Sequence, residues 1–207
     1  MSVQLSTVRS KVLVSAALLG TAAAAAGLGT FGSFTSATSA SASVSSGTVS
    51  IALGAANTAA NRFSVAATGL VPGDTVQRGV TLTNAAGNQA LSSIVLTTSA
   101  TTSSKLDTDA TLGLQLKIDS CSTAWTETGT APAYVYSCSG TTKSVLASRA
   151  LIGSSVALSN LSALAPNTVD NLVATMSFPA GADNTFQNQS SVISFTFTGT
   201  QRAATNQ

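Results

Sequence analysis

The sequence predicts an all-β domain that folds as an antiparallel sandwich or barrel. From Gly47 onward, apolar and polar residues alternate with a period of two in about nine short segments, as in strands that bury one face. Turn residues separate these segments, and Ser and Thr fill most of the polar positions. Only 8% of the 207 residues are charged, so hydroxyl and amide side chains must cover most of the exterior.

The N-terminus has the layout of a secretory signal peptide, with a charged start, an apolar middle and a small-residue exit. Arg9 and Lys11 precede an apolar run over residues 12–28. We expect a helical signal peptide over residues 1–33, removed by a signal peptidase during export, with the cut in the range 29–42. The product is then expected to be secreted and extracellular or at the cell surface.

A retained membrane anchor is the alternative interpretation of the same apolar run. Its many Ala and Gly residues make it only mildly hydrophobic, whereas a spanning helix needs about 20 strongly apolar residues. We therefore expect cleavage and no lasting membrane anchor. Residues 34–46 are predicted to form a flexible N-terminal segment, and residues 47–207 a single β-sandwich domain.

The predicted strands are defined by apolar residues that share one face. Pro-Gly and Asn/Gly turn signals, such as Pro72-Gly73-Asp74, lie between them. After Phe34, only residues 144–151 favour a helical turn. The faces are Val49, Ile51 and Leu53; Val76, Val80 and Leu82; Ile94, Leu96 and Thr98; Leu112, Leu114, Leu116 and Ile118; Leu172, Ala174, Met176 and Phe178; and Ile193, Phe195 and Phe197.

Cys121 and Cys138 are the two cysteines of the chain, and such a pair in an exported protein predicts a disulfide. Two free thiols or half of a metal site are the alternatives, although no His and no third Cys is available to complete a metal shell. Trp125 lies inside the Cys121–Cys138 segment. We expect it to cover one end of the sandwich beside the disulfide, and a ligand platform is the alternative.

The composition argues against enzymatic chemistry. The chain has no His, which excludes His-based acid/base catalysis, His-containing triads and imidazole zinc sites. It also lacks a Gly-x-Ser-x-Gly elbow and a phosphate-binding glycine loop. We expect no catalytic residue and no cofactor. Asp107 and Asp109 are close enough in sequence to contact a calcium ion, although two carboxylates in a polar loop are more often simply solvated.

The charge balance argues against nucleic-acid binding and permits self-association. Without Arg9 and Lys11, seven Lys and Arg balance seven Asp and Glu, and no basic stripe is present. Nucleic-acid binding is therefore not expected, because it requires clustered cations for the phosphates. A body of near-zero net charge has little self-repulsion, which permits association.

Several segments carry a family resemblance in a consistent order. They are Gly29–Phe34, Ser46–Ile51, Leu70–Asp74, Val80–Asn84, Asp183–Ser190 and Phe195–Phe197. Together they resemble the TasA/camelysin family of proteins secreted by Gram-positive bacteria, often exported with a dedicated signal peptidase. The resemblance implies a jelly-roll-like β-sandwich outside the cell, and a role as a subunit or accessory of fibres in biofilm matrix.

Three functional hypotheses follow. In the first, the segment 34–46, which contains Phe34 and Val44, adds as a strand to the next subunit and builds filaments with itself or other matrix proteins. A disordered tail is the alternative for that segment. The second is a monomeric cell-surface module that binds a polysaccharide or protein. The third follows camelysin-like metalloendopeptidases, but the chain has no His-Glu-x-x-His motif and only one glutamate, Glu127.

Overall fold

The computed structural model describes residues 50–64 and 69–203, and this part of the chain is almost entirely antiparallel β-structure. The predicted signal peptide and the segment with Phe34 and Val44 lie outside the described residues. The largest sheet has five strands in the order β1 (Ala52–Leu53), β2 (Thr75–Asn84), β9 (Thr168–Ser177), β4 (Gln115–Cys121) and β7 (Thr142–Ala150). The second sheet has the order β10 (Val192–Gln201), β3 (Leu91–Thr102) and β8 (Gly153–Ala157).

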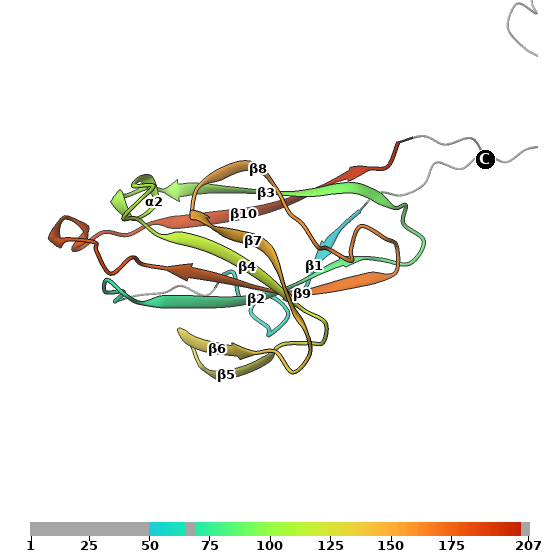
Figure 1. Cartoon of the computed structure of the whole chain (residues 1–207), viewed down its shortest axis with the longest axis horizontal. Coiled ribbons are helices and arrows are strands. Elements are labelled where there is room, and N and C mark those ends of the chain that lie inside the picture. The colour runs from blue at the N-terminus through green and yellow to red at the C-terminus, as the bar shows by residue number, and fades with distance from the viewer. Residues whose placement is uncertain (1–49, 65–68, 204–207) are drawn as a thin grey trace, which may run out of the picture. The chain divides into compact units, whose positions relative to one another are not determined.

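The two larger sheets lie in separate layers with one apolar core between them, which confirms the predicted all-β sandwich (Figure 1). The inner residues of β2, β3, β4 and β9 alternate along each strand, as period two requires. The predicted faces are buried in this core at Val80, Leu82, Ile94, Leu96, Leu116, Ile118, Leu172 and Ala174.

A third, two-stranded sheet stands apart from the two layers (Figure 1). It is a hairpin of β5 (Thr126–Thr130) and β6 (Ala133–Ser137), which pair only with each other among the named strands. Two short helices complete the described part, α2 (Lys105–Thr108) and η1 (Asn184–Phe186).

Three local predictions were wrong. Residues 144–151 do not form a helical turn, because they lie largely in β7. Val145 and Leu146 are both buried there, and register shifts between β4 and β7 break the alternation, so neighbouring apolar residues imitated a helical spacing. The predicted first strand shrinks to the exposed pair of β1, and Leu112 and Leu114 both lie before β4 begins.

Helix α2 was not predicted, since it has only four residues. Ser104 and Asp107 form a reciprocal capping box that satisfies its first backbone N–H groups. In the described ranges, no helix is both long and apolar enough to cross a membrane.

Candidate functional site

A cavity of about 900 Å³ lies between β2 and β9 of the five-stranded sheet and β10 of the other sheet. Its lining is mainly apolar and includes Val76, Met176, Phe178 and Phe195. Val71 and Val192 also line it and are 58% and 53% exposed, so the cavity reaches the surface as a groove. Large exposed apolar side chains beside such a groove are typical of an interaction site.

Both walls of this groove end in a strand edge. Among the described strands, β10 pairs only with β3, so its other edge has no strand partner. On the outer edge of β2, backbone bonds from residues 54–62 reach only Gly79 and Thr81, at 2.8–3.1 Å. Residues 75–77 of β2 therefore have no described strand on that edge. Strand edges without a strand partner are a template for an added strand, although the Gln77 carbonyl already accepts a hydrogen bond from the Arg78 side chain.

Phe63 forms one wall of the groove through an aromatic stack. Its ring centroid lies 4.6 Å from that of Phe195 and 6.3 Å from that of Phe197, both on β10. Phe195 and Phe197 share the inner face of β10, as the alternation predicted, and both pack against the core. The position of Phe63 therefore affects the shape of the groove.

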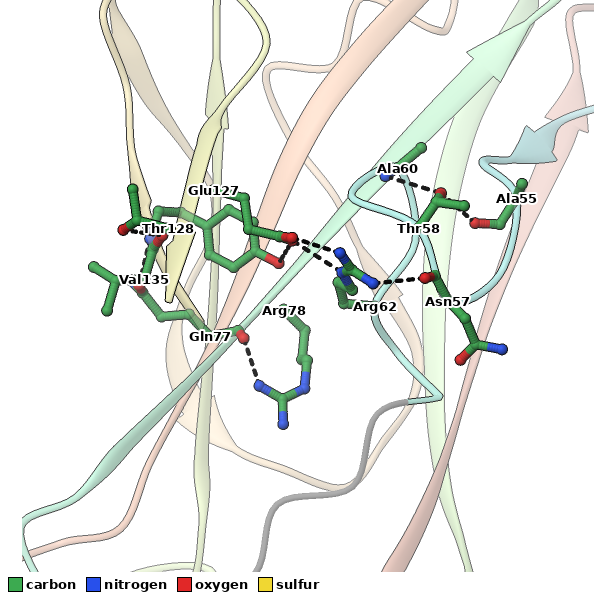
Figure 2. A network of polar contacts seen from close by, with 11 residues as sticks. Ala55, Asn57, Thr58, Ala60, Arg62, Gln77, Arg78, Glu127, Thr128 and Val135 are labelled. Atoms are coloured by element: carbon green, nitrogen blue, oxygen red, sulfur yellow. Dashed lines mark hydrogen bonds and ion pairs between the residues drawn. The ribbon is translucent and has the colours of Figure 1, made fainter. Parts of the chain in front are cut away.

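The residue before Phe63 is held by the β5–β6 hairpin. Arg62 donates from Nε and Nη2 to the two carboxylate oxygens of Glu127, at 3.0 and 2.5 Å. Its guanidinium also lies 4.6 Å from the centre of the Tyr134 ring, and its Nη1 donates to the Asn57 carbonyl. Figure 2 shows Arg62 between Glu127 on one side and Asn57 on the other. A two-point pair of this type fixes the geometry of both side chains.

Glu127 also accepts a hydrogen bond of 2.6 Å from the Tyr136 hydroxyl. The hydrogen bonds from Arg62 lower the pKa of Glu127 below its ordinary value, against the opposing effect of burial. Burial and the bond to Glu127 raise the pKa of Tyr136 to about 12. Sequence reasoning did not predict this network, because its partners come from segments 65 residues apart. The one available signal was that Glu127 is the sole glutamate of the chain.

The lowered pKa of Glu127 predicts a pH-dependent stabilisation. A carboxyl with a depressed folded-state pKa stabilises the fold above its unfolded value, and the stabilisation is lost as pH falls through the folded pKa. We expect Glu127→Gln to have a lower urea midpoint than the wild type at neutral pH. At a pH low enough to protonate Glu127 in the wild type, the two urea midpoints should be equal. Asp119→Asn, which breaks the more exposed Lys117–Asp119 pair, is the control. A wild-type advantage that stayed constant from neutral to strongly acid pH would contradict this assignment.

Tyr136 packs directly against the backbone of β2, which requires a glycine there. A Cβ added at Gly79 would lie 2.8 Å from Cε1 of Tyr136. The Tyr136 amide also donates to the Gln77 side chain at 3.1 Å. Leu172 and Ala174 point into the main core, so Val173 between them points to the outer face of the sheet. Val173 pairs in register with Gly79 and is nevertheless buried. The hairpin thus covers part of the outer face of the five-stranded sheet.

We expect Gly79→Ala to displace this hairpin. The new methyl group overlaps the Tyr136 ring, and relieving such an overlap costs about 1–3 kcal/mol. Urea unfolding of the variant measures the cost, and the combination with Tyr136→Leu tests its origin. The loss caused by Gly79→Ala should be much smaller in the Tyr136→Leu background. Equal losses of stability in both backgrounds would show that the added methyl group clashes with atoms other than the Tyr136 ring.

The predicted disulfide is present and fixes the base of the hairpin. Cys121, the last residue of β4, is bonded to Cys138, which follows β6, with 5.8 Å between the two Cα atoms. Trp125 lies half-buried between Cys121 and β5, and its Nε1 donates to the Asn171 carbonyl of β9 at 2.9 Å. The hairpin is therefore attached to the five-stranded sheet at both of its strands.

The two aspartates considered as calcium ligands lie at α2. Asp107 is buried and accepts hydrogen bonds from the Ser104 amide and from the hydroxyls of Ser103 and Ser191. Burial opposes ionisation, but these bonds outweigh it and lower its pKa. Asp109 accepts from two backbone N–H groups of the following turn, which lower its pKa. Both are local caps: Asp107 also joins α2 to Ser191, just before β10, and Asp109 caps the turn that follows it.

The sequence model of the camelysin metallo-endopeptidase family matches residues 8–206. The chain belongs to this family. Family membership confirms the resemblance seen in the separate sequence segments. A search of curated proteins finds no match.

The description of the family implies a metal centre, and the residues here do not fit one. The chain contains no His, and the described residues contain no group of three or more Cys, Asp or Glu side chains arranged to hold a metal ion. The sole glutamate, Glu127, is engaged by Arg62 and Tyr136, and both cysteines form the disulfide. No hydrolytic step can be assigned to these side chains.

Proposed function

We propose that this protein is a secreted structural subunit that assembles into extracellular matrix fibres by strand addition. The single observation that carries the proposal is the apolar groove between two strand edges, one on β2 and one on β10. Membership of the camelysin family and the signal-like leader support it. Its occupant is the segment 34–46 of the next subunit.

The length of that segment suits the groove. At about 3.3 Å per residue, residues 34–46 span about 43 Å when extended, and the 10 residues of β10 span about 33 Å. Backbone hydrogen bonds to the open edges then supply affinity, as in other cases of strand addition. Because donor and acceptor are different surfaces of the same chain, the contact does not close and builds a filament.

The side chains of the segment also suit it. When the segment is extended, alternate residues lie on opposite faces. One face carries Phe34, Ala40, Ala42 and Val44 among small polar residues, and the other is mostly Ser. The first face matches the apolar lining of the groove, and the second can lie against solvent. The segment has no charged residue that would have to be desolvated on insertion.

The test compares chains that begin at residue 34 and at residue 47, examined by electron microscopy and sedimentation. We expect filaments only from the longer chain, because only it carries the donor segment. Within the longer chain, Val44→Asp should prevent filament formation, since it places an unpaired carboxylate in an apolar groove. Ser43→Asp, on the opposite face, is the matched control and should leave assembly intact. Equal polymerisation of both chain lengths would overturn the proposal.

The family description favours a second candidate function, that of a peptidase. Incubating the mature protein with an unfolded protein substrate, with and without a chelator, tests it. The structural proposal predicts no chelator-sensitive cleavage. A mature protein that stays monomeric and cleaves nothing would instead favour the cell-surface binding module.

A further inference from the structure

The β5–β6 hairpin contacts the groove through two routes that the proposed function leaves unexplained. In the first, Glu127 binds Arg62, and the adjacent residue Phe63 stacks on Phe195 in the groove wall. The Arg62 backbone is also fixed, because its N–H donates to the Gly79 carbonyl at 2.9 Å. Glu127 is therefore linked to the groove wall through the Arg62 side chain and one peptide unit.

The second route runs through Arg78. This side chain is 1% exposed, lies on β2 and lines the groove. Its Nη1 donates to the Gln77 carbonyl at 2.7 Å and to the Pro132 carbonyl of the hairpin turn at 3.1 Å. Figure 2 shows Arg78 beside Gln77, with its guanidinium pointing away from Glu127. The hairpin turn thus helps to orient the Arg78 guanidinium in the groove lining.

The hairpin depends on its attachments for its own position. An isolated two-stranded hairpin is at best marginally stable in water, and β5 and β6 pair only with each other among the named strands. The Cys121–Cys138 bond limits how far the hairpin can separate from the end of β4. Without it, the hairpin is held by side-chain contacts such as those of Glu127, Tyr136 and Trp125 and by the bond from Arg78 to the Pro132 carbonyl.

We propose that the hairpin is a positioning element for the groove, and that the groove accepts a strand only when the Cys121–Cys138 disulfide is formed. The part concerning strand acceptance rests on the proposed function. Glu127 and the disulfide act through Arg62 and Phe63, so they are positioning residues that do not touch the incoming strand. A chain with both thiols reduced is then unable to assemble.

The chemistry of the switch is ordinary thiol–disulfide exchange. Forming the bond removes two protons and two electrons from the thiols of Cys121 and Cys138, and a disulfide-containing oxidant accepts them and becomes two thiols. The cytoplasm keeps thiols reduced, whereas the exterior allows disulfides to persist. Subunits would therefore become competent to assemble only after export, which prevents filaments from forming inside the cell.

The first experiment measures the coupling without reference to assembly. Hydrogen exchange is followed in mature wild type, in Cys121→Ser/Cys138→Ser and in Glu127→Gln, with Asp119→Asn as control. The emission of Trp125, the sole tryptophan, reports whether the hairpin stays docked. We expect a red shift in the cysteine-free variant, and in both hairpin variants about tenfold faster exchange in residues 60–63 and in the paired strands β10 and β3, with β9, the central strand of the other sheet, unchanged. A red shift without faster exchange in those segments would overturn the inference.

The second experiment measures filament growth of the same proteins. We expect growth to fall about tenfold or more in the cysteine-free variant and in reduced wild type, and to return when the wild type is reoxidised. Normal growth of the cysteine-free variant would overturn the inference. If the wild type forms no filament while the exchange result holds, the proposed function fails and the coupling of hairpin and groove stands.

Discussion

A single carboxylate at the mouth of the groove is expected to abolish filament growth. Val192 opens β10, is 53% exposed and lines the groove. In Val192→Asp, an incoming strand would cover a charge that has no partner, which costs several kcal/mol. We expect filament growth to fall by about 100-fold or more, which corresponds to roughly 2.7 kcal/mol of lost binding. Light scattering with electron microscopy measures the change.

The chain offers a matched control for this variant. Val135 is 59% exposed, as much as Val192, but it lies on β6, and the groove lining does not include it. Val135→Asp should assemble as the wild type does. Both substitutions replace exposed side chains, so both should leave the free energy of unfolding within about 0.5 kcal/mol. If Val192→Asp and Val135→Asp lost assembly equally, the added charge itself would explain the loss. The result would then contradict a specific role of the groove.

Removing the disulfide is expected to cause the largest loss of stability. Cys121 and Cys138 are 17 residues apart, and closing a loop of that size stabilises by about 3 kcal/mol through the entropy of the unfolded chain. For a domain of this length, the loss lowers Tm by about 6–12 °C. Calorimetry of Cys121→Ser/Cys138→Ser against oxidised wild type measures it. The strand content by circular dichroism should stay nearly constant, because the main core does not include the hairpin.

A control separates the effect of losing the cross-link on Tm from the effect of replacing the two cysteine side chains. Wild type with its disulfide reduced should show the same loss of Tm as the double variant. If the reduced wild type kept the oxidised Tm, the cross-link would contribute little, and the hairpin would be held by its other contacts alone. Agreement between the two unlinked proteins would assign the loss of Tm to the missing cross-link.

Strands that lie wholly in the main sheets were predictable from the sequence. β2, β3, β4 and β9 each bury one face against the same core, so the period of two is visible in residues such as Val80 and Leu82, or Ile94 and Leu96. β7 was not predictable, because register shifts against β4 bring Val145 and Leu146 together on buried positions. The apolar pattern of β7 can be interpreted only when its register with β4 is known.

The site was predictable only in part. The disulfide was predicted from the two cysteines of the chain and the expectation of export. The hairpin strands carry mostly exposed residues, and the position of Glu127 depends on Arg62, which is far away in the sequence. The groove arises where two strand edges have no described partner, and a local pattern cannot reveal the absence of a neighbour.

The location of the donor segment in an assembled filament is the most direct test of the account. Electron cryomicroscopy of filaments grown from the mature protein measures it. We predict that residues 34–46 of one subunit lie as a strand between β2 and β10 of the next, with Phe34 and Val44 on the face toward the groove. Filaments in which that groove is empty, or in which subunits meet through other surfaces, would contradict assembly by strand addition.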